Sequence, residues 1–240
     1  MDGATIDTSV GATPALSASG VRVRARGALP ALTLDFVLCP AELHLIHSRH
    51  KERSSDIVDA LLGLSDAGTG SVRFLDRAWH QLNMREACEL RRAVGRVQDR
   101  GNWMEARSVM DNVLMPIRHH TILSEQEMRG LASALARQFG LPGLPLLLPG
   151  DCAPGDLERA ACVRAFLGRP ALVVLEHPMA FEDSALLVPL INAIQQVRRR
   201  GGAVLWFTEH ASHAAEASLS ADRHRELVDT QLIDLKRSRR

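Results

Sequence analysis

Two acid–histidine pairs are the side chains of this sequence best suited to chemistry. Glu176 and His177 follow the apolar run at residues 171–175, whose length and composition predict a buried parallel strand. Glu209 and His210 follow a second apolar run. A carboxylate can bind Mg²⁺, and an imidazole with its ordinary pKa of about 6.5 can act as a general base. The four residues are therefore the candidates for catalysis.

The segment at residues 48–56 has the position, but not the composition, of a phosphate-binding loop. A P-loop follows the pattern GxxxxGK[ST], because glycine lets backbone N–H groups close around phosphate oxygens and the lysine balances their charge. Counting back from Gly63, this segment contains no glycine, and Ser54 stands at the lysine position. Ser55 keeps the hydroxyl that would join Glu176 in binding Mg²⁺. Side-chain bulk opposes a close backbone nest, so tight binding of the P-loop type is not expected. The candidate phosphate-binding residues are Ser48, Lys51, Arg53, Ser54, Ser55 and Asp56.

The composition is that of an ordinary globular domain. The chain has 240 residues, of which 46% are hydrophobic and 24% are charged, and its formal net charge is +1. This near-balance gives no electrostatic reason to expect binding to nucleic acid or to a membrane surface. The four cysteines form no CxxC motif, which argues against a disulfide framework or a zinc site and favours a reducing cytosol. No apolar run reaches the roughly 18 residues that span a bilayer.

Strands that alternate with helices predict an α/β fold with a parallel core. Ser124 and Glu127 stand at capping-box positions for a predicted helix at residues 125–139. From residue 211 the chain is polar, and we expect it to be mostly helical with a basic end. Predicted strands lie at residues 21–26 (an edge strand), 32–38, 42–46, 71–75, 171–176 and 203–208, and further predicted helices at residues 56–64, 85–92, 159–168 and 184–200.

The composition of successive segments predicts the domain boundaries. We expect a disordered tail at residues 1–20, which are rich in Gly, Ala, Ser and Thr and lack the basic and apolar regions of a signal peptide. The folded domain is expected at residues 21–229, with a helical subdomain at about residues 105–165. Residues 230–240 are expected to form a basic C-terminal tail.

In the order and spacing of these segments, residues 21–229 resemble the nucleotide-binding subunit of an ABC transporter. Gly63 followed by residues 70–74 resembles the segment after the P-loop helix. Residues 109–113 followed by 116–125 resemble, in particular, the ATPases of Mla-type lipid transporters. The resemblance implies a P-loop-NTPase-like ABC ATPase domain, with a mixed sheet as its core, N-terminal antiparallel strands and a helical subdomain. It also implies ATP and Mg²⁺ as cofactors.

The same resemblance implies a set of partners. Mla-type ATPases work with a membrane permease and an MCE-domain protein to move phospholipid between bacterial membranes. For this chain, the implied partners are an MlaE-like membrane permease, a second ABC cassette in a homodimer or heterodimer, and an MCE-domain protein in indirect contact. The implied location is the cytoplasm, at the inner face of a bacterial inner membrane.

The two catalytic motifs of the family are altered in this sequence. Such ATPases carry Asp-Glu at the end of the Walker B strand, where this chain has Glu176 and His177. Glu209 aligns with the histidine of the family's switch segment, so acid and histidine are exchanged between the two positions. From this exchange we expect a structural His177–Glu209 hydrogen bond across neighbouring strand ends. A shift of one residue would instead place His210 at the switch position.

Of three further motifs, the Q-loop and the signature are changed and the D-loop residue is retained. The Q-loop glutamine aligns with Asp99, next to Gln98, and Asp183 stands at the D-loop position, where it could contribute to a dimer contact. In the signature segment, Ala153 lacks the hydroxyl of the family motif and Pro154 lacks a backbone N–H donor. The segment is therefore expected to be a helix-entry loop. The signature LSGGQ aligns with Cys152, Ala153, Pro154, Gly155 and Asp156, of which Gly155 alone matches.

These changes predict a cassette that keeps the fold and has lost the parts that handle phosphate. We expect a subunit of a lipid transport system of the Mla or MCE type, impaired or inactive in ATP hydrolysis, that acts as a structural or regulatory pseudo-ATPase. Two alternatives remain open. One is an active but divergent ABC ATPase, with Glu176 as metal ligand and His177 as base. The other is a soluble regulatory protein on the same fold.

Overall fold

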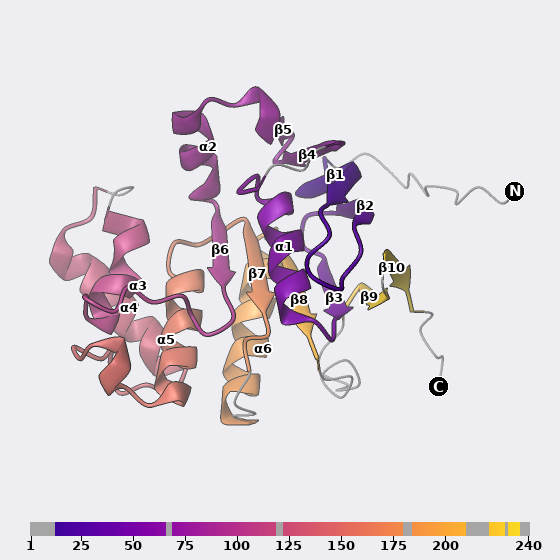
Figure 1. The fold of residues 1–240 in the computed structure, drawn as a ribbon. Coiled ribbons are helices and arrows are strands. Elements are labelled where there is room, and N and C mark those ends of the chain that lie inside the picture. Colours follow the sequence, from indigo (N-terminus) through magenta and orange to yellow (C-terminus); the bar gives the residue numbers. More distant parts are fainter. Residues whose placement is uncertain are drawn as a thin grey trace, which may run out of the picture.

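Two sheets and the helices around them make up the described part of the chain (Figure 1). The computed structural model describes residues 13–65, 69–118, 122–179, 184–209, 221–228 and 230–235. The strands are β1 (Leu16–Val23), β2 (Leu32–Leu38), β3 (Leu43–His47), β4 (Ser71–Phe74), β5 (Arg77–Ala78), β6 (Val94–Val97), β7 (Leu172–Glu176), β8 (Ala203–Thr208), β9 (Arg223–Val228) and β10 (Gln231–Asp234). The α-helices are α1 (Lys51–Leu61), α2 (Met84–Arg91), α3 (Val109–Arg118), α4 (Glu125–Gln138), α5 (Pro154–Phe166) and α6 (Ser184–Arg199).

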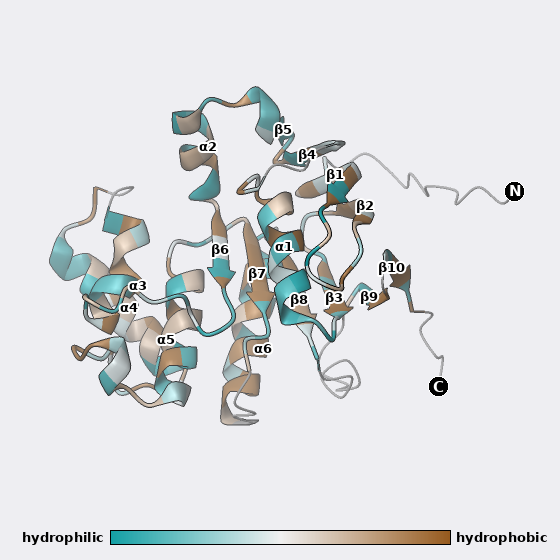
Figure 2. Cartoon of the chain, in the orientation of Figure 1, coloured by the Kyte–Doolittle hydropathy of each residue, from teal (hydrophilic) through white to brown (hydrophobic). Residues whose placement is uncertain are grey.

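The larger sheet, with the strand order β10-β9-β3-β8-β7-β6, forms the centre of the fold. Its strands from β9 to β6 pair in parallel, and β10 pairs antiparallel with β9. Every residue of β7 and β8 is buried, because packed side chains cover both faces of the sheet. In Figure 2, β7 is hydrophobic along its length, whereas hydrophilic residues appear on outer helices such as α4.

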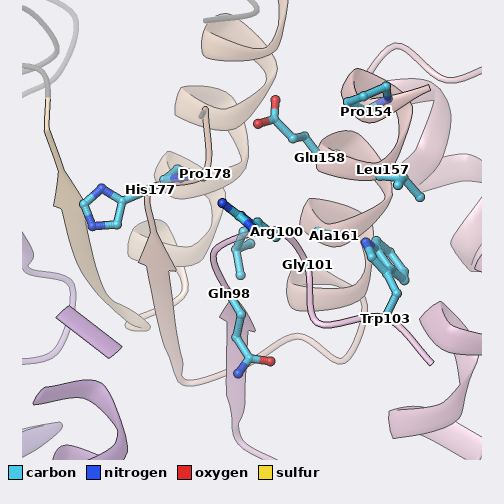
Figure 3. A pocket seen from close by; sticks show the side chains of 11 residues that line it. Gln98, Arg100, Gly101, Trp103, Pro154, Leu157, Glu158, Ala161, His177 and Pro178 are labelled. Carbon is cyan, nitrogen blue, oxygen red and sulfur yellow. The ribbon is translucent and has the colours of Figure 1, made fainter. Parts of the chain in front are cut away.

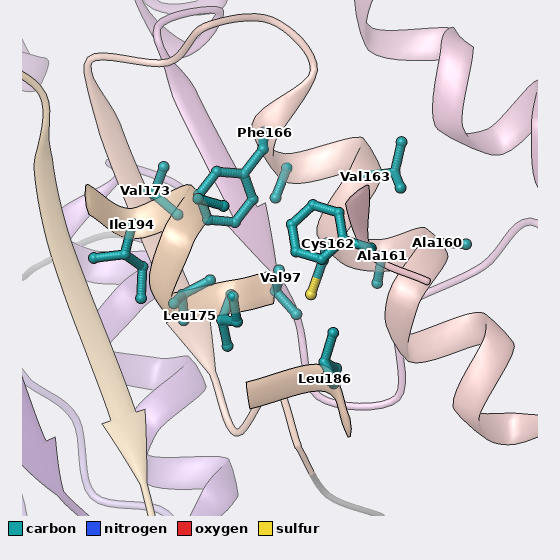
Figure 4. Packing of buried hydrophobic residues seen from close by; sticks show 14 of the residues in the cluster. Val97, Ala160, Ala161, Cys162, Val163, Phe166, Val173, Leu175, Leu186 and Ile194 are labelled. Carbon is teal, nitrogen blue, oxygen red and sulfur yellow. The ribbon is translucent and has the colours of Figure 1, made fainter. Parts of the chain in front are cut away.

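Alternate residues of β7 point into two different cores. Val173 and Leu175 belong to one cluster of buried residues, together with side chains of α3 to α6. Leu172 and Val174 belong to a second cluster, with α1 and the smaller sheet. This division follows from the two-residue repeat of a strand. Figure 4 shows Val173 and Leu175 in the first cluster with Phe166 of α5, so this cluster joins the helical part of the chain to the central sheet.

The smaller sheet is antiparallel, as predicted for the N-terminal strands, and has the order β2-β1-β4-β5. The start of β1 differs from the expectation. It begins at Leu16, so the predicted disordered tail of residues 1–20 extends too far, and residues 1–12 lie outside the described residues. Residues 16–19 of β1 lie between β2 and β4, whereas residues 21–23, in the segment expected to be an edge strand, pair with β2 alone. A register shift between Ala18 and Val21 interrupts the apolar alternation, which explains why the pattern indicated only the second half of the strand.

The helices α3, α4 and α5 pack against one another within the predicted helical subdomain. The predicted capping box of α4 is confirmed. The Ser124 hydroxyl accepts a hydrogen bond from the backbone N–H of Glu127, and the Glu127 carboxylate accepts one from the backbone N–H of Ser124. Both interactions are local in sequence, so they fix the start of α4 without help from the rest of the fold.

The C-terminal segment forms strands where the sequence predicted a polar helix. β9 pairs in parallel with β3, and β10 folds back onto β9. Arg225 gives the physical reason, because its side chain is 10% exposed and donates a hydrogen bond of 2.6 Å to Asp234. The Arg225 guanidinium also lies over the ring of Phe36, at 5.1 Å from its centroid. Polar residues thus pack here through ion pairs and ring contacts, which a hydropathy pattern does not detect. The predicted basic tail at residues 230–240 likewise contains β10, and residues 236–240 lie outside the described residues.

Candidate functional site

Glu176, the last residue of β7, is fully buried and contacts Ser55 and Arg96. The Ser55 hydroxyl donates a hydrogen bond of 2.7 Å to Oε2 of Glu176. Arg96 donates from Nε to Oε1 at 2.5 Å and from Nη2 to Oε2 at 3.2 Å. The two residues that could bind Mg²⁺ therefore lie together. A guanidinium, however, stands beside the carboxylate where a metal ion would bind.

Arg96 is a site residue that sequence analysis did not identify. It lies on β6, its side chain is 13% exposed, and its Nη1 donates a hydrogen bond of 2.7 Å to Asp59. Burial acts to lower the pKa of Arg96, but hydrogen bonds and charge from Glu176 and Asp59 outweigh it and raise that pKa. The sequence feature that could have identified Arg96 is its position as a single charge between Gly95 and Val97 in a short apolar segment. Such a charge needs a partner when the strand is buried.

The connection between β3 and α1 is only three residues long, because α1 begins at Lys51. The predicted helix began at residue 56, so that boundary was wrong by five residues. The segment before it contains good helix formers and no glycine. Arg53, at a glycine position of the P-loop pattern, is 1% exposed. Its guanidinium donates hydrogen bonds to the backbone oxygens of Arg24 at 2.8 Å and Pro30 at 2.5 Å. The side chain thus ties α1 to the turn between β1 and β2.

Lys51 connects two other predicted site segments. Its Nζ lies 3.2 Å from Oε1 of Glu209 and 3.6 Å from Oδ1 of Asp99. The same oxygen of Glu209 lies 3.6 Å from Nδ1 of His177. His177 and Glu209 therefore meet at the neighbouring strand ends, but this separation exceeds hydrogen-bond length and suits an ion pair when the ring is protonated. On its other side, Nε2 of His177 lies 3.2 Å from the Ser54 hydroxyl.

The remaining predicted residues at this end of the sheet lie at its margins. The Ser54 hydroxyl also contacts that of Ser48, at 3.0 Å. Asp56 accepts a hydrogen bond of 2.7 Å from Arg26, away from Glu176. Gln98 accepts one from a side chain of its own loop. Two predicted site residues, Asp183 and His210, lie outside the described residues.

The signature-like segment lies across a cavity from the loop that follows β6 (Figure 3). Ala153 is the N-cap residue of α5 and makes no side-chain cap, and Pro154, Gly155 and Asp156 form the first turn. Cys152 precedes them and is partly buried. The cavity has a volume of about 400 Å³ and separates this turn from the other predicted residues. The signature-like segment and the residues around Glu176 thus form two distinct groups in this chain.

Comparison with curated proteins finds relatives of low identity among transporter ATP-binding proteins, and no protein-family model matches the chain. The chain is 29% identical over 128 residues to the intermembrane phospholipid transport system ATP-binding protein MlaF of Haemophilus influenzae, covering 53% of this chain and 48% of that protein. It is 29% identical over 196 residues to the nickel import ATP-binding protein NikE of Pseudomonas putida, covering 80% and 72%. It is 25% identical over 186 residues to the cell division ATP-binding protein FtsE of Escherichia coli, covering 76% and 81%. The chain thus spans about half the length of MlaF.

Solved structures show the same architecture. A dimeric bacterial ABC transporter cassette superposes with a TM-score of 0.79 at 17% identity, over 90% of this chain and 96% of that one. The chain has the fold of an ABC cassette. An ATP-binding subunit of an ABC transporter superposes with a TM-score of 0.74 over 92% of this chain and 88% of that one, at 18% identity. The predicted resemblance and the predicted fold, a mixed sheet with an N-terminal antiparallel sheet, are therefore confirmed.

Within the described ranges, no group of three or more His, Cys, Asp or Glu side chains is arranged to hold a metal ion. No helix in those same ranges is long and apolar enough to cross a membrane.

Proposed function

We propose that this cassette is a subunit of an ABC transporter whose nucleotide site is closed by its own arginine side chains and does not hydrolyse ATP. The contact between Arg96 and Glu176 carries the proposal. Both carboxylate oxygens are already engaged, by Arg96 and by the Ser55 hydroxyl. A metal ion at this buried carboxylate would stand next to a guanidinium of like charge. The residues in this arrangement therefore do not fit Mg²⁺.

Arg53 supports the same proposal from the other side of α1. Its buried guanidinium binds two backbone oxygens of the turn between β1 and β2. Releasing it would leave a charge buried without a partner, which is costly. The arginine contacts thus stabilise the site in a form that needs no nucleotide, and the fold remains available for contacts with other subunits.

The transported substrate and the partners are proposed from relatedness. MlaF is named for phospholipid transport, whereas other relatives of this chain are named for nickel import and cell division. We favour a lipid transport system of the Mla type because the segment at residues 109–125 also resembles those ATPases. The partners would be an MlaE-like permease, a second cassette and, indirectly, an MCE-domain protein, with the chain at the cytoplasmic face of the inner membrane.

Thermal denaturation in the presence of Mg-ATP tests the proposal. A ligand at 100 times its dissociation constant stabilises a fold by about 2.7 kcal/mol, so binding would raise the Tm clearly. We expect no rise at millimolar Mg-ATP and no release of phosphate. The same titration of Ser55→Ala and Glu176→Gln is the control, because a genuine rise must disappear in both variants.

A rise in Tm that both variants abolish would favour the second candidate, an active but divergent ATPase. One observation supports it: the Ser55 hydroxyl and Glu176 are in direct contact, with His177 nearby. In that case Glu176 and Ser55 are the metal-binding residues and His177 the base. Phosphate release by the chain alone, absent from His177→Ala, would establish this candidate and contradict the closed site.

A further inference from the structure

The cavity between α5 and the loop after β6 has the size and lining of a small-molecule site. Its volume of about 400 Å³ lies within the roughly 300–1,000 Å³ typical of ligand pockets. One wall is a single face of α5, because Leu157, Glu158 and Ala161 recur at helical spacing. The opposite wall contains Val97 and Trp103. Apolar side chains thus form most of the lining.

The two ends of the cavity differ in polarity. Figure 3 shows Trp103 and Leu157 toward one end, and the charged groups of Arg100 and Glu158 toward the other, near Pro178. In the described part of the chain, no ion pair of the Arg100 side chain is observed. An apolar interior with one cation and one anion at its mouth is suited to an amphipathic ligand that carries both charges.

The wall that carries Trp103 is held in place before any ligand arrives. Arg100, Gly101 and Asn102 all have positive φ, at 56°, 76° and 47°. Such a backbone persists only where its surroundings hold it. Here the partly buried Arg164 donates a hydrogen bond to the Gly101 oxygen and stacks on Trp103, at 4.6 Å from the ring centroid. A pre-organised wall loses little entropy on binding, which favours a specific site.

We propose that this cavity binds a free apolar α-amino acid. The ligand side chain lies against Trp103 and Leu157, its carboxylate pairs with Arg100, and its ammonium group pairs with Glu158. The cavity adjoins the residues around Glu176, because His177 and Gln98 belong to its lining. The residues that bind the ligand, Arg100 and Glu158, are not among the candidate nucleotide-binding residues.

Calorimetric titration of the full chain with L-phenylalanine and L-leucine tests the proposal. We expect saturable binding of one molecule per chain. Phenylacetate lacks the ammonium group and phenethylamine lacks the carboxylate, so each should bind at least about tenfold more weakly, as expected for loss of one charge-assisted hydrogen bond. Arg100→Gln and Glu158→Gln should each weaken phenylalanine binding by a similar factor. Arg107→Gln, in the same loop and exposed, should leave it unchanged.

Ala161→Leu provides a second test that does not touch either charge, because the larger side chain fills the cavity. It should abolish binding of both amino acids. If the folded wild-type chain, with its usual Tm, shows no saturable binding at millimolar amino acid, the proposal is overturned. If phenylacetate binds as tightly as phenylalanine, the ammonium group is not recognised. That result overturns both the role of Glu158 and the assignment of the ligand as an amino acid. Binding that survives both charge variants and Ala161→Leu places the ligand elsewhere and likewise overturns the proposal.

Discussion

Arg96 and Glu176 lie side by side on neighbouring parallel strands, with nitrogen–oxygen distances of 2.5 and 3.2 Å. They are 80 positions apart in the sequence. Glu176 is fully buried, so its charge is tolerated only because Arg96 and Ser55 hydrogen-bond to it. The contact that excludes a metal ion from this carboxylate therefore also supports the fold.

Replacing Arg96 by methionine should destabilise the cassette strongly. Removing one partner of a buried ion pair leaves the other charge unpaired, which costs about 3–5 kcal/mol. The measurement is the free energy of unfolding in urea. Arg85→Met is the matched control, because the Arg85 side chain is 89% exposed and its ion pair lies on the surface. It should change stability by less than about 0.5 kcal/mol.

The double variant Arg96→Met, Glu176→Leu separates the charge from the packing. Replacing both members of a buried pair by apolar side chains of similar volume is often nearly neutral. We therefore expect the double variant to recover most of the stability that Arg96→Met loses. If the single variant Arg96→Met and the double variant lose the same free energy of unfolding, an unpaired carboxylate is not the cause of the loss.

A second prediction concerns Gly95, where β6 packs closely against α5. A Cβ at this position would lie 1.9 Å from the backbone oxygen of Ala165. Gly95→Ala must displace backbone, so we expect a loss of about 2 kcal/mol or more in the free energy of unfolding. The matched control is Gly130→Ala, in the exposed interior of α4, where a Cβ meets nothing within 4 Å. This change should stabilise the chain by about 0.5–1 kcal/mol. A neutral Gly95→Ala would contradict the close packing.

A third prediction concerns Asn112, which holds the loop before α3. Its Nδ2 donates to the backbone oxygens of Met104, Arg107 and Ser108 at 3.0–3.1 Å, and its Oδ1 accepts from the N–H of Met104 at 2.8 Å. Asn112→Ala should cost about 1–3 kcal/mol because these groups lose their partner. Hydrogen exchange at residues 104–108 should become faster.

Asn112→Asp is the sharper variant for the same contact. It keeps the size of the side chain but directs an acceptor at three carbonyl oxygens, so it should destabilise the loop at least as much as alanine. Gln138→Ala, at the exposed end of α4, should have no effect on exchange in the loop. Wild-type stability in Asn112→Asp would show that the amide is not oriented as described.

The sequence predicted those features that depend on neighbouring residues. The capping box of Ser124 and Glu127 lies within one helical turn, and the buried strand before Glu176 has a continuous apolar composition. The partner of Glu176 was not predictable in this way. Arg96 reaches it only because β6 and β7 pair in parallel, and nothing local to either strand indicates that pairing.

The C-terminal strands illustrate the same limit. The polar sequence of β9 lacks an apolar alternation, yet it pairs with β3 because Arg225 finds both Asp234 and the ring of Phe36. The start of α1 was misplaced for a different reason. The resemblance to a P-loop suggested a loop up to residue 55, but Arg53 is buried within a helix that begins at Lys51. A motif position without its glycine does not predict the backbone of the motif.

The last prediction concerns pH and His44, a fully buried residue of β3. Burial, followed by the charges of Arg225 and Arg223, lowers the pKa of His44 to about 3. Its Nε2 lies 3.1 Å from Glu42, a contact that a neutral ring makes by donating its N–H. In the unfolded chain the ring binds a proton below about pH 6.5. The unfolded state therefore binds more protons between about pH 3 and 6.5, and stability must fall as the pH is lowered through that range.

Unfolding in urea between about pH 7 and pH 5 measures this contribution when wild type is compared with His44→Gln. Below about pH 6.5 the free energy of unfolding of the wild type should fall by up to about 1.4 kcal/mol per pH unit more than that of the variant. The reason is that the unfolded wild type binds one proton more than its folded state. All other titrating groups are common to both proteins, so they cancel in the difference. His80→Gln, at an exposed position, should follow the wild type. Equal slopes for wild type and His44→Gln would mean that the fold does not hold this ring neutral.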